Sequence, residues 1–304
     1  MRKIQFTKMV ASGNDFTVIR LSPACPAGRG YPVIRLKKLA RAICDRKFGI
    51  GADGLLVLGR SGKADLCMRV FNADGSEASM CGNGARCAAL YFSRQSPSLN
   101  HWRAGIVHSV QQLTIDTKAG IIEAQVSGDN VKIKLTDPRD IRLDIPLKIN
   151  GRLLKANFIN TGVPHAVIFV QGLSGIDVAN LGRQIRYHRN FAPAGTNVNF
   201  VELADKRSIK VRTYERGVED ETLACGTGSV ASVLIFALKT GSGNKILVHT
   251  QGKEVLKVYF KRDAKFTPTP TAKKQKSNTQ LVWGFRDVCL EGKARIVAKG
   301  EYYV

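Results

Sequence analysis

The chain has 304 residues, of which 44% are hydrophobic and 23% charged, a globular composition with enough apolar residues for two cores. No apolar run approaches the roughly 18 residues that cross a membrane, and Met1 to Met9 contain no hydrophobic signal core. We therefore expect a soluble, cytoplasmic protein without a membrane partner. The net charge of +23 would suit nucleic-acid binding, but Lys and Arg are spread along the chain, which favours an ordinary basic surface.

The seven cysteines are an odd number and form no CxxC pair. This spacing argues against a disulfide framework and against a zinc site. In a reducing cytoplasm we expect thiols, most of them buried as small apolar residues. A functional cysteine must therefore be recognised by its surroundings.

Short strand-like runs dominate the chain, so the sequence favours an α+β class over a doubly wound α/β fold. Helical spacing of Leu36, Leu39, Ala40 and Ile43 predicts one amphipathic helix. Further helices are predicted at 85–92 and 229–240, where small and apolar residues follow a glycine-rich turn. The basic, Pro- and Thr-rich stretch Arg262 to Asn278 predicts an exposed insertion. Strands are predicted, in chain order, at 4–10, 16–20, 55–59, 68–72, 113–117, 121–126, 131–135, 166–170, 197–203, 209–214, 245–250 and 255–260.

An internal repeat is the clearest organisational feature of the sequence. The segment from Arg69 through Asn72 and Glu77 to Cys81-Gly-Asn-Gly84 is echoed from Arg212 through Glu215 and Glu221 to Cys225-Gly-Thr-Gly228. Both copies run from a strand to an acidic turn, then to Glu four residues before Cys, and then to Cys-Gly-x-Gly before a helix. The repeat predicts two domains of like fold. We place one at 1–128 plus 292–304, carrying Cys81, and the other at 129–291, carrying Cys225.

A Cys-Gly-x-Gly loop that enters a helix has specific chemical properties. The first backbone N–H groups of a helix have no intrahelical acceptor and, with the helix dipole, bind anions such as a carboxylate. A cysteine at that position has its thiolate stabilised. A single buried cysteine is more often structural, but the duplicated setting of Cys81 and Cys225 reverses that expectation. Cys87 is expected to be buried by its helix.

Two such loops suit the inversion of an α-amino acid. That reaction needs a base on one face of the α carbon and an acid on the other, in opposite protonation states. Helix N-termini on the substrate carboxylate would stabilise the negative charge that develops. No cofactor and no metal are needed for this chemistry. Dinucleotide binding is disfavoured because no βαβ unit surrounds either glycine pair.

These motifs resemble those of the diaminopimelate epimerase family, and matching blocks run along nearly the whole chain. They are Ser12-Gly-Asn14-Asp-Phe16, Asp45-Arg46 with Gly49-Ile-Gly51-Ala-Asp53, Phe71 to Glu77, Cys81 to Cys87, Pro164-His165, Gly195-Thr-Asn197, Glu215-Arg216-Gly217 and Cys225 to Gly228. The resemblance implies two similar domains, each a mixed β-sheet wrapped around a central helix, with the last strand returning to the first domain. It also implies epimerisation of LL- and meso-diaminopimelate, in lysine and peptidoglycan-precursor biosynthesis, and it favours a homodimer.

The resemblance implies a role for each matching residue. Cys81 and Cys225 match the two catalytic cysteines, and His165 and Glu215 match residues that tune the pKa of the thiols. Arg216 offers a planar fork for a distal carboxylate, and Glu215 an acceptor for a distal ammonium. The matches to substrate-binding residues are Asn14, Asn72, Gly82, Asn83, Asn197, Glu215, Arg216, Gly226 and Thr227.

Two alternatives stay open. The first is a cofactor-independent racemase of another amino acid on the same fold, since few pocket contacts set side-chain specificity. Gly54 and Val163 stand where some family members have glutamine and asparagine, which leaves the exact substrate open. The second is a basic nucleic-acid-binding protein on a retired epimerase fold. The intact Cys-Gly-x-Gly loops in both halves argue against it, since the fold alone does not need them.

Overall fold

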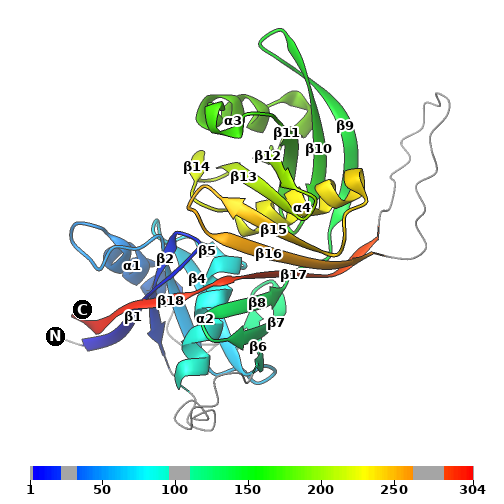
Figure 1. Cartoon of the computed structure of the whole chain (residues 1–304). Coiled ribbons are helices and arrows are strands. Elements are labelled where there is room, and N and C mark those ends of the chain that lie inside the picture. Colours follow the sequence, from blue (N-terminus) through cyan, green and yellow to red (C-terminus); the bar gives the residue numbers. More distant parts are fainter. Residues whose placement is uncertain (1–2, 22–32, 96–109, 263–283, 304) are drawn as a thin grey trace. The chain divides into compact units, whose positions relative to one another are not determined.

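The computed structural model describes residues 3–21, 33–95, 110–262 and 284–303 (Figure 1). The chain divides into an N-terminal unit, residues 1–134 with 291–304, and a C-terminal unit, residues 135–290. Within the described ranges, no helix is both long enough and apolar enough to cross a membrane. Of the insertion predicted at Arg262 to Asn278, all residues after Arg262 lie outside the described residues.

In its described residues, the N-terminal unit is a mixed sheet with the helices α1 and α2. Strands β1 and β2 form an antiparallel hairpin, β3 is parallel to β2, β4 is antiparallel to β3, and β6 is parallel to β4. The last strand of the chain, β18, pairs with β1, as the family resemblance implied. The elements are β1 (Lys3–Ala11), β2 (Asn14–Arg20), α1 (Val33–Cys44), β3 (Gly54–Gly59), β4 (Leu66–Asn72), β5 (Glu77–Ala78), α2 (Gly82–Gln95), β6 (Gln111–Thr117), β7 (Gly120–Ser127), β8 (Asn130–Lys134) and β18 (Arg295–Tyr303).

The C-terminal unit repeats this order of elements. Here β10 pairs with β11, β12 is parallel to β11, β13 is antiparallel to β12, and β15 is parallel to β13. The elements are β9 (Arg139–Ile149), β10 (Arg152–Asn160), β11 (Pro164–Phe169), α3 (Val178–Arg186), β12 (Asn197–Asp205), β13 (Ser208–Glu215), β14 (Asp220–Thr222), α4 (Gly226–Thr240), β15 (Lys245–Thr250) and β16 (Val255–Arg262), with short 3-10 turns at Leu173–Gly175 and Arg189–Phe191. Strand β17 (Phe285–Lys293) begins in this unit, and its last residues, 291–293, belong to the N-terminal unit.

The common pairing pattern aligns the two units residue by residue. In each unit an arginine on the fourth strand of the repeat pairs with the glutamate four residues before the cysteine, Arg69 with Glu77 at 2.8 Å and Arg212 with Glu221 at 2.7 Å. These equivalent ion pairs show which residue of one unit corresponds to which residue of the other. In this alignment Phe16 corresponds to His165, Gly54 to Asn197, Leu56 to Asn199, Val70 to Thr213, Asn72 to Glu215 and Cys81 to Cys225.

Each sheet buries one helix on each face, and strand alternation decides which residues meet which helix. Leu55 and Val57 pack with α1, whereas Leu56 contacts α2 at Gly84. In the same way Val198 and Phe200 pack with α3. Helices α2 and α4 are buried along most of their length, as their small and apolar residues predict.

The sequence-based expectations for the fold are largely confirmed. The structure is α+β with two similar halves, and the amphipathic helix predicted from Leu36, Ala40 and Ile43 is α1, which buries these three residues. The helices predicted after the two glycine-rich turns are α2 and α4. One expectation is wrong: Cys67, buried on β4, is disulfide-bonded rather than a thiol. Composition alone could not reveal it because disulfide formation depends on which side chains meet.

The packing of α3 on β13 gives a direct test of this fold. A Cβ atom at Gly182 would lie 2.4 Å from the Cβ of Tyr214, so any side chain must push helix and strand apart. We expect Gly182→Ala to lower the free energy of unfolding by about 1–3 kcal/mol, the usual cost of overpacking. Gly175→Ala is the control, since nothing lies within 4 Å of its Cβ position. Denaturant unfolding should separate the two variants, and equal stability would contradict the packing described.

Candidate active site

Cys225 stands at the N-terminus of the buried helix α4. It is the N-cap residue, with extended backbone (φ −113°, ψ 116°), and it is 7% exposed. Its carbonyl accepts the first helical hydrogen bond, from the Ser229 amide at 2.9 Å. Its Sγ lies 3.5 Å from Oγ1 of Thr227. The thiol therefore sits where the first N–H groups of the helix can also hold an anion.

Close packing of the helix against the sheet explains the second glycine of the Cys-Gly-x-Gly motif in each unit. A Cβ at Gly228 would lie 2.3 Å from Oδ1 of Asn199, a polar side chain on β12. A Cβ at Gly84 would lie 3.0 Å from a methyl group of Leu56, the corresponding residue on β3. The helix starts therefore press on their sheets, and only glycine allows that approach at Gly228.

Glu215 lies beside Cys225 at the end of β13. Burial raises the pKa of Glu215, and hydrogen bonds from Thr222 (Oγ1 to Oε2, 3.2 Å) and from the Cys225 thiol oppose that rise. A carboxylate that accepts a hydrogen bond from a thiol favours the thiol over the thiolate. This preference ends when the proton transfers from the sulfur to the carboxylate. The structure thus brings together Cys225 and Glu215, two of the predicted site residues.

His165 is completely buried on β11, next to β12. Burial lowers the pKa of His165 to about 3, and the positive charge of Arg216 adds to the effect. The imidazole is therefore neutral at physiological pH. Its Nδ1 lies 3.1 Å from Nδ2 of Asn199.

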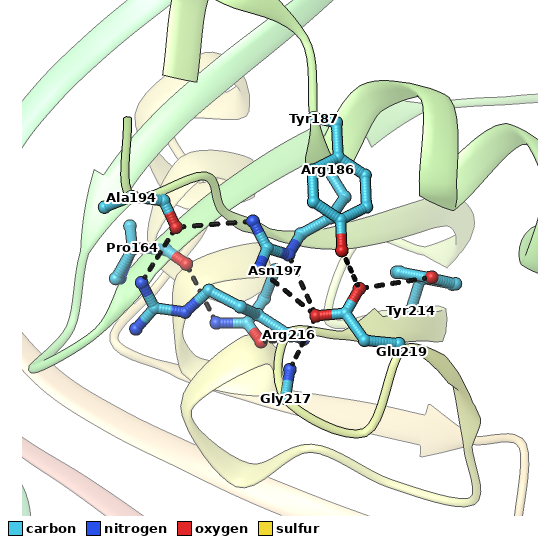
Figure 2. A network of polar contacts seen from close by, with 9 residues as sticks. All are labelled: Pro164, Arg186, Tyr187, Ala194, Asn197, Tyr214, Arg216, Gly217 and Glu219. Atoms are coloured by element: carbon cyan, nitrogen blue, oxygen red, sulfur yellow. Dashed lines mark hydrogen bonds and ion pairs between the residues drawn. The ribbon is translucent and has the colours of Figure 1, made fainter. Parts of the chain in front are cut away.

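Asn197 ties the Glu215–Arg216 turn to the sheet (Figure 2). Its Nδ2 donates to the Pro164 carbonyl at 2.9 Å, and its Oδ1 accepts from the Arg216 amide at 2.8 Å. Arg216 extends its guanidinium to the Ala194 carbonyl at 3.3 Å. Asn197 is 4% exposed, and its two hydrogen bonds hold the backbone at Arg216 against the end of β11.

Glu219 is the centre of the network in Figure 2. Its Oε1 accepts from the Gly217 amide at 3.0 Å and from Nη2 of Arg186 at 3.1 Å. Its Oε2 accepts from the hydroxyl groups of Tyr187 at 3.2 Å and Tyr214 at 3.3 Å. Glu219 has a positive φ of 61°, which is uncommon for a side-chain-bearing residue. The network thus closes the turn that carries Glu215 and Arg216.

Cys81 occupies the matching place in the N-terminal unit, before α2. Its Sγ accepts from the Gly84 amide at 3.4 Å, and its carbonyl accepts from Ala85 at 2.8 Å. The neighbouring Asn83 is 8% exposed, and its Oδ1 accepts from the buried guanidinium of Arg86 at 2.7 Å. The same Nη2 of Arg86 donates to Oγ of Ser12 at 2.6 Å. Arg86 thereby joins the helix start to the β1–β2 turn.

Asn14 on β2 and Asn72 on β4 lie at the same edge of the sheet as Gly54 on β3, the strand between them. Asn14 starts β2, two residues before Phe16, which pairs with Gly54 on β3, and Gly54 in turn pairs with Asn72 at the end of β4. Oδ1 of Asn14 is buried and has no hydrogen-bond partner among the described residues. A Cβ at Gly54 would lie 2.9 Å from the Phe71 carbonyl, so glycine relieves crowding there.

The predicted site residues fall into two sets, one in each unit. The C-terminal set is Cys225, Gly226, Thr227, Glu215, Arg216, Asn197 and His165, and the N-terminal set is Cys81, Gly82, Asn83, Asn72 and Asn14. Sequence reasoning missed Arg86, Asn199 and Glu219, which hold these residues in place. Arg86 lies in the Cys81 to Cys87 block and Asn199 in the strand predicted at 197–203, but their burial shows only in three dimensions.

Comparison with known proteins identifies the family. A family model for diaminopimelate epimerase matches residues 6–140 and 157–269. The chain belongs to the diaminopimelate epimerase family. The diaminopimelate epimerase of Archaeoglobus fulgidus is 41% identical over 276 residues, covering 87% of this chain and 92% of the relative. That of Carboxydothermus hydrogenoformans is 36% identical over 315 aligned positions, covering 99% and 100%.

Solved structures share the fold of this epimerase family member at low sequence identity. A phenazine biosynthesis protein of the PhzF family from Bacillus anthracis matches with a TM-score of 0.69 at 18% identity, covering all of both chains. A hydroxyproline epimerase from Agrobacterium vitis matches with a TM-score of 0.67 at 13% identity, covering 99% of this chain and 92% of the other. These likenesses show the two-half fold.

The Glu219 network predicts a pH-dependent contribution to stability. Desolvation favours neutral Glu219, but the Gly217 amide, the charge of Arg186 and the Tyr187 hydroxyl outweigh it and hold the pKa of Glu219 below its usual value. A depressed pKa stabilises the folded state above the unfolded pKa of about 4.3, and this contribution is lost as the pH falls through the folded pKa. We expect Glu219→Gln to lower Tm at pH 7 and the difference from wild type to shrink on acidification.

Thermal melts over a pH series measure this difference. Glu123→Gln is the control, because Glu123 is exposed and pairs with Lys134 at the surface, where an ion pair contributes little. A difference for Glu219→Gln that stays constant from neutral to acid pH would contradict the assignment.

Proposed function

We propose that this chain interconverts LL- and meso-diaminopimelate, with Cys81 and Cys225 as the acid and base on opposite faces of the α carbon. The observation that carries the proposal is the pair of cysteines at equivalent positions, each directly before a buried helix in one of two similar units. Family membership and the names of the relatives supply the substrate. The pathway would be lysine and peptidoglycan-precursor biosynthesis.

The reaction needs only the two thiols and the helix starts. A thiolate removes the α proton and becomes a thiol, and the electron pair left on the α carbon delocalises into the substrate carboxylate. The other thiol delivers its proton to the opposite face and becomes the thiolate, so one turnover exchanges the two protonation states. Amides at the start of α2 and α4 would stabilise the charge on the carboxylate. No pyridoxal phosphate and no metal enter this scheme.

Glu215 and His165 are proposed to set the protonation state of Cys225. The contact between Glu215 and the Cys225 thiol supports this role for Glu215, since a buried acid of raised pKa can exchange a proton with the thiol. The neutral state of His165 means that it adds no positive charge near Cys225. The thiol is then held protonated until substrate binds.

Arg216 is proposed to bind the distal carboxylate of the substrate. Its backbone is fixed through Asn197 and its guanidinium is close to the Ala194 carbonyl, which leaves the planar fork for a bidentate partner. Asn14 and Asn72 on the N-terminal unit are proposed substrate contacts. The buried, unpartnered Oδ1 of Asn14 within the described part of the chain suits an incoming ammonium donor.

The proposal predicts that each cysteine is indispensable. We expect Cys81→Ala and Cys225→Ala each to reduce conversion of LL- to meso-diaminopimelate by at least about 10³-fold, because general acid–base catalysis contributes on that scale. Cys87→Ala is the control: Cys87 is completely buried on α2 and should affect stability only. Conversion is followed by chiral separation of the isomers, with circular dichroism to check folding.

Two results would contradict the proposal in different ways. If the wild-type protein does not convert diaminopimelate but racemises another amino acid, the substrate is wrong. If either alanine variant keeps near-wild-type turnover, the two-thiol assignment is wrong.

A further inference from the structure

Three polar side chains form a chain inside the C-terminal unit, on the face of the sheet opposite to α3. Thr213, Asn199 and His165 are 3%, 0% and 0% exposed. Oγ1 of Thr213 donates to Oδ1 of Asn199 at 3.0 Å, and Nδ2 of Asn199 lies 3.1 Å from Nδ1 of His165. Their strand neighbours Ala166, Val198, Phe200 and Tyr214 belong to the α3 core, so alternation places all three toward α4.

A backbone carbonyl fixes which way the Asn199 amide points. Nδ2 of Asn199 is 3.1 Å from the Ala166 carbonyl, which can only accept a hydrogen bond. The atom on that side must therefore be the NH2 group, and the Thr213 hydroxyl donates to the oxygen on the other side. Turning the amide over would place its oxygen against the Ala166 carbonyl and lose that buried hydrogen bond.

The orientation of the amide decides the tautomer of His165. Because Nδ2 donates toward Nδ1, Nδ1 must carry a lone pair, and the ring proton resides on Nε2. An imidazolium would bring two N–H groups face to face at Nδ1. Nε2 is itself buried and has no hydrogen-bond partner in the described part of the chain. A buried donor left without an acceptor is costly, and such groups occur where a ligand supplies the partner.

The N-terminal unit has no such arrangement at the corresponding positions. Phe16, Leu56 and Val70 stand where the C-terminal unit has His165, Asn199 and Thr213, and all three are buried. Two units of one fold need the same volume filled at these points, and the first shows that apolar side chains fill it. The polar chain is therefore an added feature of the half that carries Cys225.

The polar chain also touches the start of α4. A Cβ at Gly228 would meet Oδ1 of Asn199 at 2.3 Å and Cβ of Cys225 at 3.3 Å, so Asn199 and Cys225 flank the same glycine. Anything bound to the first amides of α4 is held at the end of the helix that Asn199 supports. Asn199, which contacts Nδ1 of His165, thus lies beside the first turn of the helix that carries the proposed thiol.

We propose that Asn199, braced by Thr213, is a positioning residue that holds His165 as a neutral imidazole with its proton on Nε2, so that this N–H serves the reaction at Cys225. A neutral donor can stabilise developing negative charge without competing for the α proton. The proposal rests on the proposed function for its catalytic consequence, but its structural part, the tautomer, is independent of any substrate.

The tautomer is measured in the substrate-free protein by ¹⁵N NMR of histidine side chains. The chain has five histidines, and the signal of His165 is assigned by its loss in His165→Gln. Between pH 5 and pH 8 the wild type should show Nδ1 without a proton and Nε2 with one. A protonated Nδ1 in this range would overturn the proposal.

The variant Asn199→Leu gives Asn199 the side chain of its counterpart Leu56. We expect a second tautomer to appear at His165 and kcat for diaminopimelate to fall about tenfold to a hundredfold, with KM changed much less, since the effect lies in the transition state. Asn157→Leu is the matched control. Asn157 is a 2% exposed amide of the same unit whose side-chain hydrogen bonds, among the described residues, go to backbone groups of Asp144 and Val167. It should lose stability without changing the tautomer or kcat.

Unchanged tautomer and unchanged kcat in Asn199→Leu would overturn the proposal. If Asn199→Leu does not fold, Thr213→Val replaces it. That variant removes only the hydroxyl that braces Oδ1, and it should shift the same two readouts in the same direction by a smaller amount. No change in either would also overturn the proposal. If wild-type protein shows the expected tautomer yet does not turn over diaminopimelate, the proposed function fails while the tautomer claim stands.

Discussion

The close approach of a buried helix to a sheet is the constraint on which the rest of the structure depends. Helices α2 and α4 are buried along most of their length, and each begins directly after a cysteine. The same close packing requires glycine at Gly228, where the Asn199 side chain occupies the Cβ position. The Cys-Gly-x-Gly motif, which predicts an anion-binding loop, is therefore also needed for packing of the helix on the sheet. Chemistry at the helix start and burial of the helix are two consequences of one arrangement.

Duplication gave two units of one fold, but their interiors differ where it matters for chemistry. In the N-terminal unit a buried guanidinium, Arg86, connects the helix start to the β1–β2 turn. In the C-terminal unit the polar side chains of Thr213, Asn199 and His165 replace the apolar ones of Val70, Leu56 and Phe16. Because the two sides of an α carbon are not equivalent in a substrate that carries a second amino-acid centre at one end, two unlike surroundings for the two thiols are expected.

Much of the fold and of the candidate site could be predicted from the sequence. The repeat around Cys81 and Cys225, the helices after each glycine pair and the alternation of the strands are local patterns, and they are confirmed in the structure. The positioning residues could not be found in this way. Asn199 is one of several polar residues on β12, and only the pairing of β12 with β11 and β13 shows that it meets His165 and Thr213. The ties of Arg86 to Ser12 and to the Lys293 carbonyl likewise join segments far apart in the chain, and the disulfide at Cys67 left no local signal.

The central claim is that two groups, one on each face of the α carbon, move the proton. The most direct measurement incubates wild-type protein with LL-diaminopimelate in heavy water, stops the reaction early and determines deuterium at the α carbon of both isomers. The two-thiol account predicts that the meso product carries solvent deuterium at the inverted carbon while the recovered LL substrate still carries protium, because the donor thiol exchanges with solvent before substrate binds. Meso product that retains the original protium would show that one group both removes and returns the proton, and would contradict the account.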